Sequence, residues 1–205
     1  MKTLKKIIIS LVCIIMVFAL ASCAAENDTE NVVADSPAAD HVQVTVKVKD
    51  FGTFVLELYP EYAPETVANF VKLAKSGFYE GTKFHRVVEN FMAQGGEAVN
   101  GEELEPIKGE FLSNGFAQNT LKHERGTISM ARTTDKDSAT SQFFICYTEC
   151  PSLDGDYAAF GKVINGMDTI DSFLSVERVS NGFDSSPAVP VEDIVIESMT
   201  VNYSE

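Results

Sequence analysis

The sequence lacks the motifs on which most enzyme classes depend. No Gly-x-Ser-x-Gly elbow, Walker loop or dinucleotide fingerprint occurs in its 205 residues. The three histidines, His41, His85 and His123, are scattered, and no cysteine or histidine cluster has the spacing of a zinc site. We therefore predict a protein that uses no metal, no cofactor and no evident nucleophile.

Basic residues are also scarce. The chain has 16 Lys and Arg against 30 Asp and Glu, for a formal net charge of -14. Such a chain repels phosphate backbones, so we predict no nucleic-acid partner. The hydrophobic fraction of 45% is too high for disorder, and the length fits one domain with a tail.

The N-terminus has the pattern of a targeting segment. Met1 to Lys6 carries positive charge, and residues 7–20 form an apolar run that is short for a membrane-spanning helix. Leu20-Ala21-Ser22-Cys23 resembles a bacterial lipobox, in which the peptide is cut before the cysteine. We predict a lipoprotein signal peptide at residues 1–22, lipidation of Cys23 and attachment to the extracytoplasmic face of the cell membrane. An ordinary secretory signal with a chance cysteine is the alternative.

Residues 23–41 are acidic and aperiodic, which indicates a flexible tether. The pattern changes at Val42, where apolar and polar residues begin to alternate, and we predict one domain over residues 42–203. Many short strands separated by turns favour a sandwich or a closed barrel. The predicted helices span about 64–75 and 167–173, and the predicted strands span 42–48, 53–58, 84–88, 91–96, 127–131, 142–146, 158–163 and 193–201.

One stretch, residues 84–96, combines polar and apolar groups unusually. Arg86 and Gln94 stand among Phe91, Met92 and neighbouring valines on two predicted strands. Because burying an arginine is costly unless its donors are satisfied, this pattern indicates a concave site with an apolar floor and a few aimed donors. The alternative is an arginine at a strand edge that points to water.

Several motifs then follow in a fixed order. Phe84-His85-Arg86 and Phe91-Met92-Ala93-Gln94-Gly95-Gly96 are followed by the segments 126–131, 141–145, 153–155 and 160–163. This series resembles the cyclophilin-type peptidyl-prolyl cis-trans isomerases from about Val42 to Val201. The resemblance implies a mainly β fold, a closed eight-stranded antiparallel β-barrel capped by two α-helices. It also implies rotation of X–Pro bonds in unfolded or exported proteins, a reaction that needs no cofactor. Nothing in the sequence suggests more than a monomer.

The resemblance assigns roles to individual residues. Arg86 matches the catalytic arginine, and Gln94 matches the glutamine that orients it. Phe91, Met92 and Phe144 match the pocket for the proline ring, and plain core packing is the alternative for these three residues. The residues that match the substrate site are Phe91, Met92 and Phe144 in the pocket, Leu153 at its wall, Tyr157 at its rim, and Ala131, Arg132, Thr133 and Gln142 along the groove.

The sequence departs from well-known family members in places. Ser152 stands where animal members have a tryptophan that matters to cyclosporin binding, so we expect weak inhibition. Tyr157 replaces a frequent histidine, and Arg132 replaces an asparagine used through its backbone. The loop after Gly96 is acidic, with Glu97, Glu102, Glu103 and Glu105, which indicates either solvated charge or a preference for basic clients.

Two questions stay open at the level of sequence. Cys146 and Cys150 either pack as small buried hydrophobes or form a bridge, which needs a turn to bring them together. The groove either catalyses rotation or serves as a proline-peptide-binding or chaperone module with little turnover. A third interpretation is a structural surface lipoprotein.

Overall fold

The computed structural model describes residues 42–101 and 103–203. The predicted signal peptide, Cys23, the tether and Glu102 lie outside the described residues. The predicted strands and helices are all present, with ends that shift by a few residues. The elements are β1 (Val42–Val48), β2 (Gly52–Leu58), α1 (Pro64–Lys75), β3 (Phe84–Val88), β4 (Met92–Gly95), β5 (Thr127–Met130), β6 (Phe143–Cys146), β7 (Ala159–Asn165), α2 (Met167–Ser172), β8 (Arg178–Val179), β9 (Val189–Pro190), β10 (Ile196–Tyr203) and the 3-10 turns η1 (Leu112–Asn114), η2 (Pro151–Leu153) and η3 (Phe173–Ser175).

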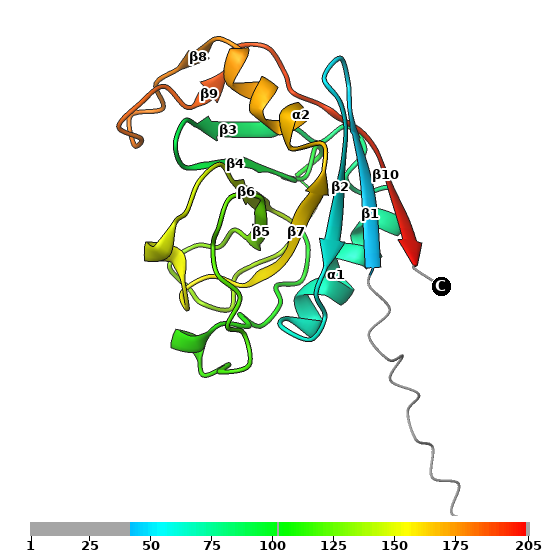
Figure 1. Ribbon diagram of the computed structural model, residues 1–205, viewed down its shortest axis with the longest axis vertical. Coiled ribbons are helices and arrows are strands. Elements are labelled where there is room, and N and C mark those ends of the chain that lie inside the picture. Colours follow the sequence, from blue (N-terminus) through cyan, green and yellow to red (C-terminus); the bar gives the residue numbers. More distant parts are fainter. Residues whose placement is uncertain (1–41, 102, 204–205) are drawn as a thin grey trace, which may run out of the picture. The chain divides into compact units, whose positions relative to one another are not determined.

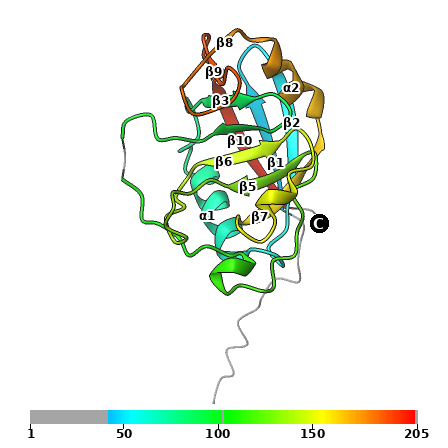
Figure 2. The ribbon, with the colours of Figure 1, turned by 90° about the vertical axis from the view of Figure 1, so that its left-hand side faces the viewer.

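Eight strands form one antiparallel sheet in the order β10-β1-β2-β7-β5-β6-β4-β3. The sheet curls on itself, and α1 and α2 lie at its opposite ends (Figures 1 and 2). Alternation places Val44 and Val46 of β1 and Leu56 of β2 inside, all fully buried. The predicted alternation of apolar and polar residues therefore identifies the side chains that point to the inner face of this sheet.

The prediction of a closed barrel is wrong. In the part of the chain that the structure describes, no ladder joins the edge strands β3 and β10. Their sides meet through an isolated bridge between Lys83 and Val195. The segment between β8 and β10, which lies beside β3, carries Pro187 and Pro190. Neither proline has an N–H to donate to a ladder. The fold is thus a curled half-barrel of eight antiparallel strands.

The helix α1 packs its apolar face into the core. Pro64 stands at its first turn, and Phe70 meets the ring of Phe143 edge-on at 5.5 Å. The buried carboxylate of Glu110 accepts hydrogen bonds from the backbone N–H groups of Glu65 and Thr66, at 3.0 and 2.8 Å. Those N–H groups have no partner within a helix, so a loop residue caps α1.

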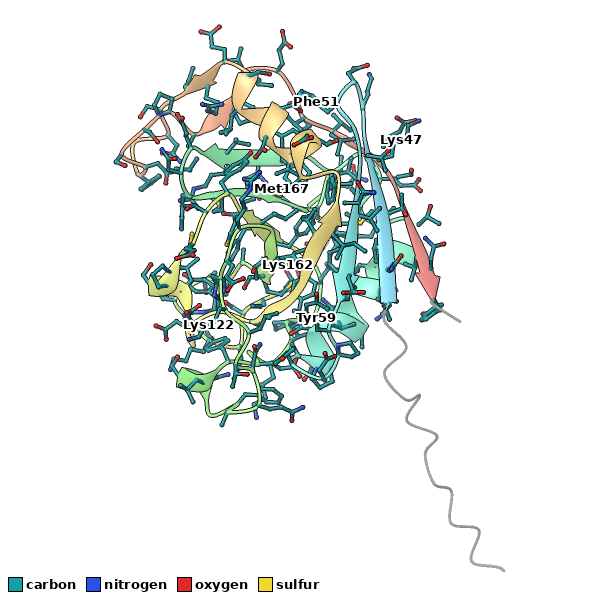
Figure 3. The ribbon with its side chains drawn as sticks, viewed as in Figure 1. Lys47, Phe51, Tyr59, Lys122, Lys162 and Met167 are labelled. Carbon is teal, nitrogen blue, oxygen red and sulfur yellow. The ribbon has the colours of Figure 1, made fainter. Side chains whose placement is uncertain are left out.

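The second helix, α2, covers the end of the sheet opposite α1 (Figure 1). Phe51, in the turn between β1 and β2, reaches toward α2 and packs edge-on against Phe173 at 5.3 Å (Figure 3). The segment after α2 contains the short pair β8 and β9. This pair docks on β3, where the Val87 N–H donates to the Ala188 carbonyl at 2.7 Å. Among the described residues, no helix is long and apolar enough to cross a bilayer.

Candidate active site

Three neighbouring strands place the central side chains in one row. Arg86 on β3 lies opposite Gln94 on β4, and Gln94 lies opposite Phe144 on β6. Ser129 on β5 continues the row beyond Phe144. Because side chains at paired positions share a face of a sheet, this register alone brings an arginine, an amide and an aromatic ring together.

These side chains line a hollow of about 410 Å³, open solvent at its mouth included. Its floor is apolar, since Met92 is 1% exposed and Phe144 is 4% exposed. Cys146, Cys150 and Ala188 pack with these two residues. Nine of the eleven predicted catalytic and substrate-binding residues line the hollow, namely Arg86, Phe91, Met92, Gln94, Ala131, Arg132, Phe144, Leu153 and Tyr157.

The polar side of the hollow is a chain of hydrogen bonds. Arg86 Nη1 donates to Gln94 Oε1 at 3.1 Å, and Gln94 Nε2 donates to Gln142 Oε1 at 2.9 Å. The guanidinium also lies 5.7 Å from the centre of the Phe91 ring. The strand-borne arginine is therefore held beside the apolar floor and does not simply point to water.

Asp184, which is not among the predicted site residues, completes the surroundings of Arg86. Its Oδ2 accepts from Arg86 Nε at 2.8 Å, and its Oδ1 accepts from Arg86 Nη2 at 2.5 Å. The hydrogen bonds from Arg86 hold the pKa of the Asp184 carboxyl below its usual range. No local signal separates this acid, 98 positions along the chain, from the other acidic residues.

The rim is built by loops. The Arg132 guanidinium stacks over the Tyr157 ring at 4.6 Å and donates to the Asp156 carbonyl through Nε and Nη2. Thr133 and Gln142 line an adjoining depression instead of the nine-residue hollow, with Gln94, Ala131 and Arg132 shared by both. Of the acidic loop, Glu97 lines a separate depression beside His85.

A buried polar network supports the floor from below. The His123 ring stacks on Phe144 with 5.9 Å between ring centres. Its Nε2 lies 3.0 Å from Ser129 Oγ, and its Nδ1 lies 3.1 Å from Asp154 Oδ1. Burial lowers the pKa of His123, so its ring is neutral at pH 7. Serine, histidine and aspartate here are arranged as in hydrolases, but Ser129 is fully buried and offers no nucleophile to a substrate.

The structure resolves the cysteine question. Cys146 and Cys150 are free and buried, and burial raises the pKa of both thiols. Their interpretation as small buried hydrophobes is confirmed. Within residues 42–101 and 103–203, no group of three or more His, Cys, Asp or Glu side chains is placed to hold a metal ion.

Comparison with known proteins decides the family. The family model for the cyclophilin type peptidyl-prolyl cis-trans isomerases matches residues 42–201. The chain belongs to the cyclophilin family. Peptidyl-prolyl cis-trans isomerase B of Escherichia coli is 41% identical to it over 163 residues, which cover 74% of this chain and 94% of that protein.

Solved cyclophilins also share the fold. A cyclophilin type isomerase from Cryptosporidium parvum superposes with a TM-score of 0.67 at 28% identity, over 80% of this chain and 99% of that one. The same protein in the presence of the dipeptide Ala-Pro gives a TM-score of 0.64. The enzyme class predicted from the ordered motifs is confirmed, whereas the roles of the individual site residues stay predictions.

Proposed function

We propose that this cyclophilin accelerates rotation about X–Pro bonds of exported proteins outside the cytoplasm, with Arg86 as its catalytic group. The observation that carries the assignment is the guanidinium of Arg86, held by Gln94 and Asp184 beside a hollow with an apolar floor. A pure proline-binding module has no need of such a fixed donor.

The reaction breaks no covalent bond and needs only a preference for the twisted amide. The rotation barrier of about 18–20 kcal/mol comes from resonance between the carbonyl and the prolyl nitrogen. A donor aimed at that nitrogen stabilises its pyramidal form, which exists only in the twisted state. Each ~1.4 kcal/mol of this preference raises the rate about tenfold.

The hollow provides both a pocket for the proline ring and a donor for the prolyl nitrogen. Met92, Phe144 and Leu153 receive the proline ring and fix the side of the bond that does not turn. Arg86 has five N–H donors, of which Asp184 takes two and Gln94 takes one. Of the two others, one N–H of Nη1 has only the weak acceptor Met92 Sδ, at 3.9 Å, and one N–H of Nη2 is left for the substrate.

Gln94 and Gln142 extend the site along the groove. Their amide groups bond each other, and both line the depression next to the hollow. Amide side chains both donate and accept, so they suit the backbone of the residues that flank the proline. We assign these two residues to substrate backbone contacts.

The location rests on the N-terminal sequence. The charged start, the apolar run and the lipobox at Cys23 support export and lipid attachment. Fractionation of cells that carry Cys23→Ala checks this part. Release of the domain from the membrane fraction supports the anchor, and retention contradicts it.

Activity is tested with a proline tetrapeptide and three proteins. The wild type should accelerate cis-trans exchange, and Arg86→Ala should lower kcat/KM by about 10²–10³-fold, as removal of an aimed donor does in other sites. Arg125→Ala is the matched control, because Arg125 also pairs with an aspartate but lies elsewhere on the surface. A folded wild type that binds the peptide without accelerating exchange supports the binding-module alternative instead.

A further inference from the structure

Arg86 stands where its orientation has to be imposed. It lies on β3, an edge strand of the sheet, and its side chain is 30% exposed. A long side chain at an edge has many rotamers, and Gln94 holds only the Nη1 end. A contact at the other end of the guanidinium is needed to fix its plane.

Asp184 makes that contact with both carboxylate oxygens. The two bonds, at 2.8 Å to Nε and 2.5 Å to Nη2, occupy one edge of the planar guanidinium. The Asp184 side chain is only 10% exposed, so water competes less for this pair than at an open surface. A bidentate pair of this kind fixes direction as well as distance, since the fork of arginine is rigid.

The carboxylate of Asp184 is itself held in place. Asn181 Nδ2 donates to Asp184 Oδ2 at 2.7 Å, and the Asp184 N–H donates back to Asn181 Oδ1 at 3.0 Å. Ala188, the residue just before β9, accepts a hydrogen bond from the N–H of Val87 on β3, the residue after Arg86. The Asp184–Arg86 contact therefore joins the loop between β8 and β9 to the strand that carries the arginine.

We infer that Asp184 is a positioning residue, which orients the Arg86 guanidinium so that the N–H groups not used by Asp184 or Gln94 meet the substrate. This inference rests on the proposed role of Arg86 as the catalytic donor. Asp184 does not line the hollow and is not expected to touch the proline. Its loss should therefore affect the chemical step more than the binding of the peptide.

The variant Asp184→Asn keeps the size of the side chain but removes the charge and one of the two acceptors. We expect kcat to fall about ten- to hundredfold, the effect of a misplaced catalytic group, with KM changed by less than about threefold. Asp193→Asn is the matched control, because Asp193 pairs with Lys83 at 2.6 Å but is 61% exposed. That control should keep the kcat of the wild type.

A double-mutant cycle separates positioning from a merely structural role. In the Arg86→Ala background, Asp184→Asn should leave the residual kcat unchanged, because there is no guanidinium left to orient. An equal loss in both backgrounds overturns the inference, and so does a kcat of Asp184→Asn within twofold of the wild type.

A readout that does not require activity keeps this test apart from the proposed function. The Nε–H of Arg86 should give an NMR signal protected from solvent exchange in the wild type, and this protection should be lost in Asp184→Asn. If the folded wild type accelerates no exchange, the proposed function fails while this signal still tests the contact. An unprotected Nε–H in the wild type overturns the positioning role, even if Asp184→Asn does not fold.

Discussion

Two arginines in this cyclophilin each form a two-pronged pair with an aspartate, one beside the hollow and one at the surface. Arg86 and Asp184 are joined by bonds of 2.8 and 2.5 Å, and Arg125 and Asp171 by bonds of 3.0 and 2.6 Å. The side chains of the first pair are 30% and 10% exposed, and those of the second are 48% and 37% exposed. Both contacts are two-bonded Arg–Asp pairs, although Arg86 donates through Nε and Nη2 and Arg125 through Nη1 and Nη2, and the surroundings of the two pairs differ.

The difference lies in what the rest of each guanidinium faces. Arg125 Nη1 also donates to the Tyr147 carbonyl, so that side chain ties α2 to the chain after β6. Arg86 instead has Gln94 and the apolar floor beside it, with donors left for a substrate. An ion pair thus indicates catalysis only through the groups around it.

The floor beside Arg86 should be the most costly to disturb. Phe144→Ala should lower the free energy of unfolding by about 3–5 kcal/mol, because it removes a buried ring that packs against His123 and Tyr157. Peptide affinity should fall with it. Urea denaturation measures the loss, with Tyr157→Phe as a control that removes only a hydroxyl from the rim. A loss below about 1 kcal/mol contradicts the role of Phe144 as floor.

The network below the floor should respond to pH. Burial lowers the folded-state pKa of His123 below the 6.5 of an ordinary histidine, so the unfolded chain gains this proton first as the pH falls. The free energy of unfolding of the wild type should exceed that of His123→Gln by a constant amount above about pH 6.5. Below that pH the difference should shrink by up to ~1.4 kcal/mol per pH unit. Comparing the two proteins by urea denaturation cancels the effect of the acidic surface. A difference that stays constant down to pH 5 contradicts the neutral, buried ring.

The surface pair should matter least. Arg125→Ala should cost about 0.2–1 kcal/mol of stability, the usual range for exposed ion pairs, and the cost should shrink in high salt. Its kcat should match that of the wild type. A catalytic loss comparable with that of Arg86→Ala would remove the distinction between the two arginines.

The sequence predicted the floor of the site better than its surroundings. Arg86, Gln94 and Phe144 are carried by strands, where alternation and ordered motifs fix which side chains share a face. Asp184 comes from a loop, and no local rule links a loop acid to a strand 98 positions away. Long-range contacts of this kind depend on how the loop packs, which periodicity does not encode.

The same distinction applies to the fold. Strand positions and both helices follow from periods of two and 3.6 residues, so they were predictable. The closure of the barrel was harder to predict, because it depends on whether the chain before β10 forms a ladder with β3. Pro187 and Pro190 near that segment were visible in the sequence, and they argue against a continuous ladder there.

One measurement tests the central claim, that a rigid guanidinium beside an apolar floor lowers the barrier to X–Pro rotation. NMR exchange spectroscopy gives the cis-trans rate constant of a bound proline peptide in the wild type and in Arg86→Lys, which keeps the charge but loses the fork. We expect fast exchange in the wild type and a rate at least about tenfold lower in Arg86→Lys, with similar peptide affinity. Equal rates in the two proteins would contradict it.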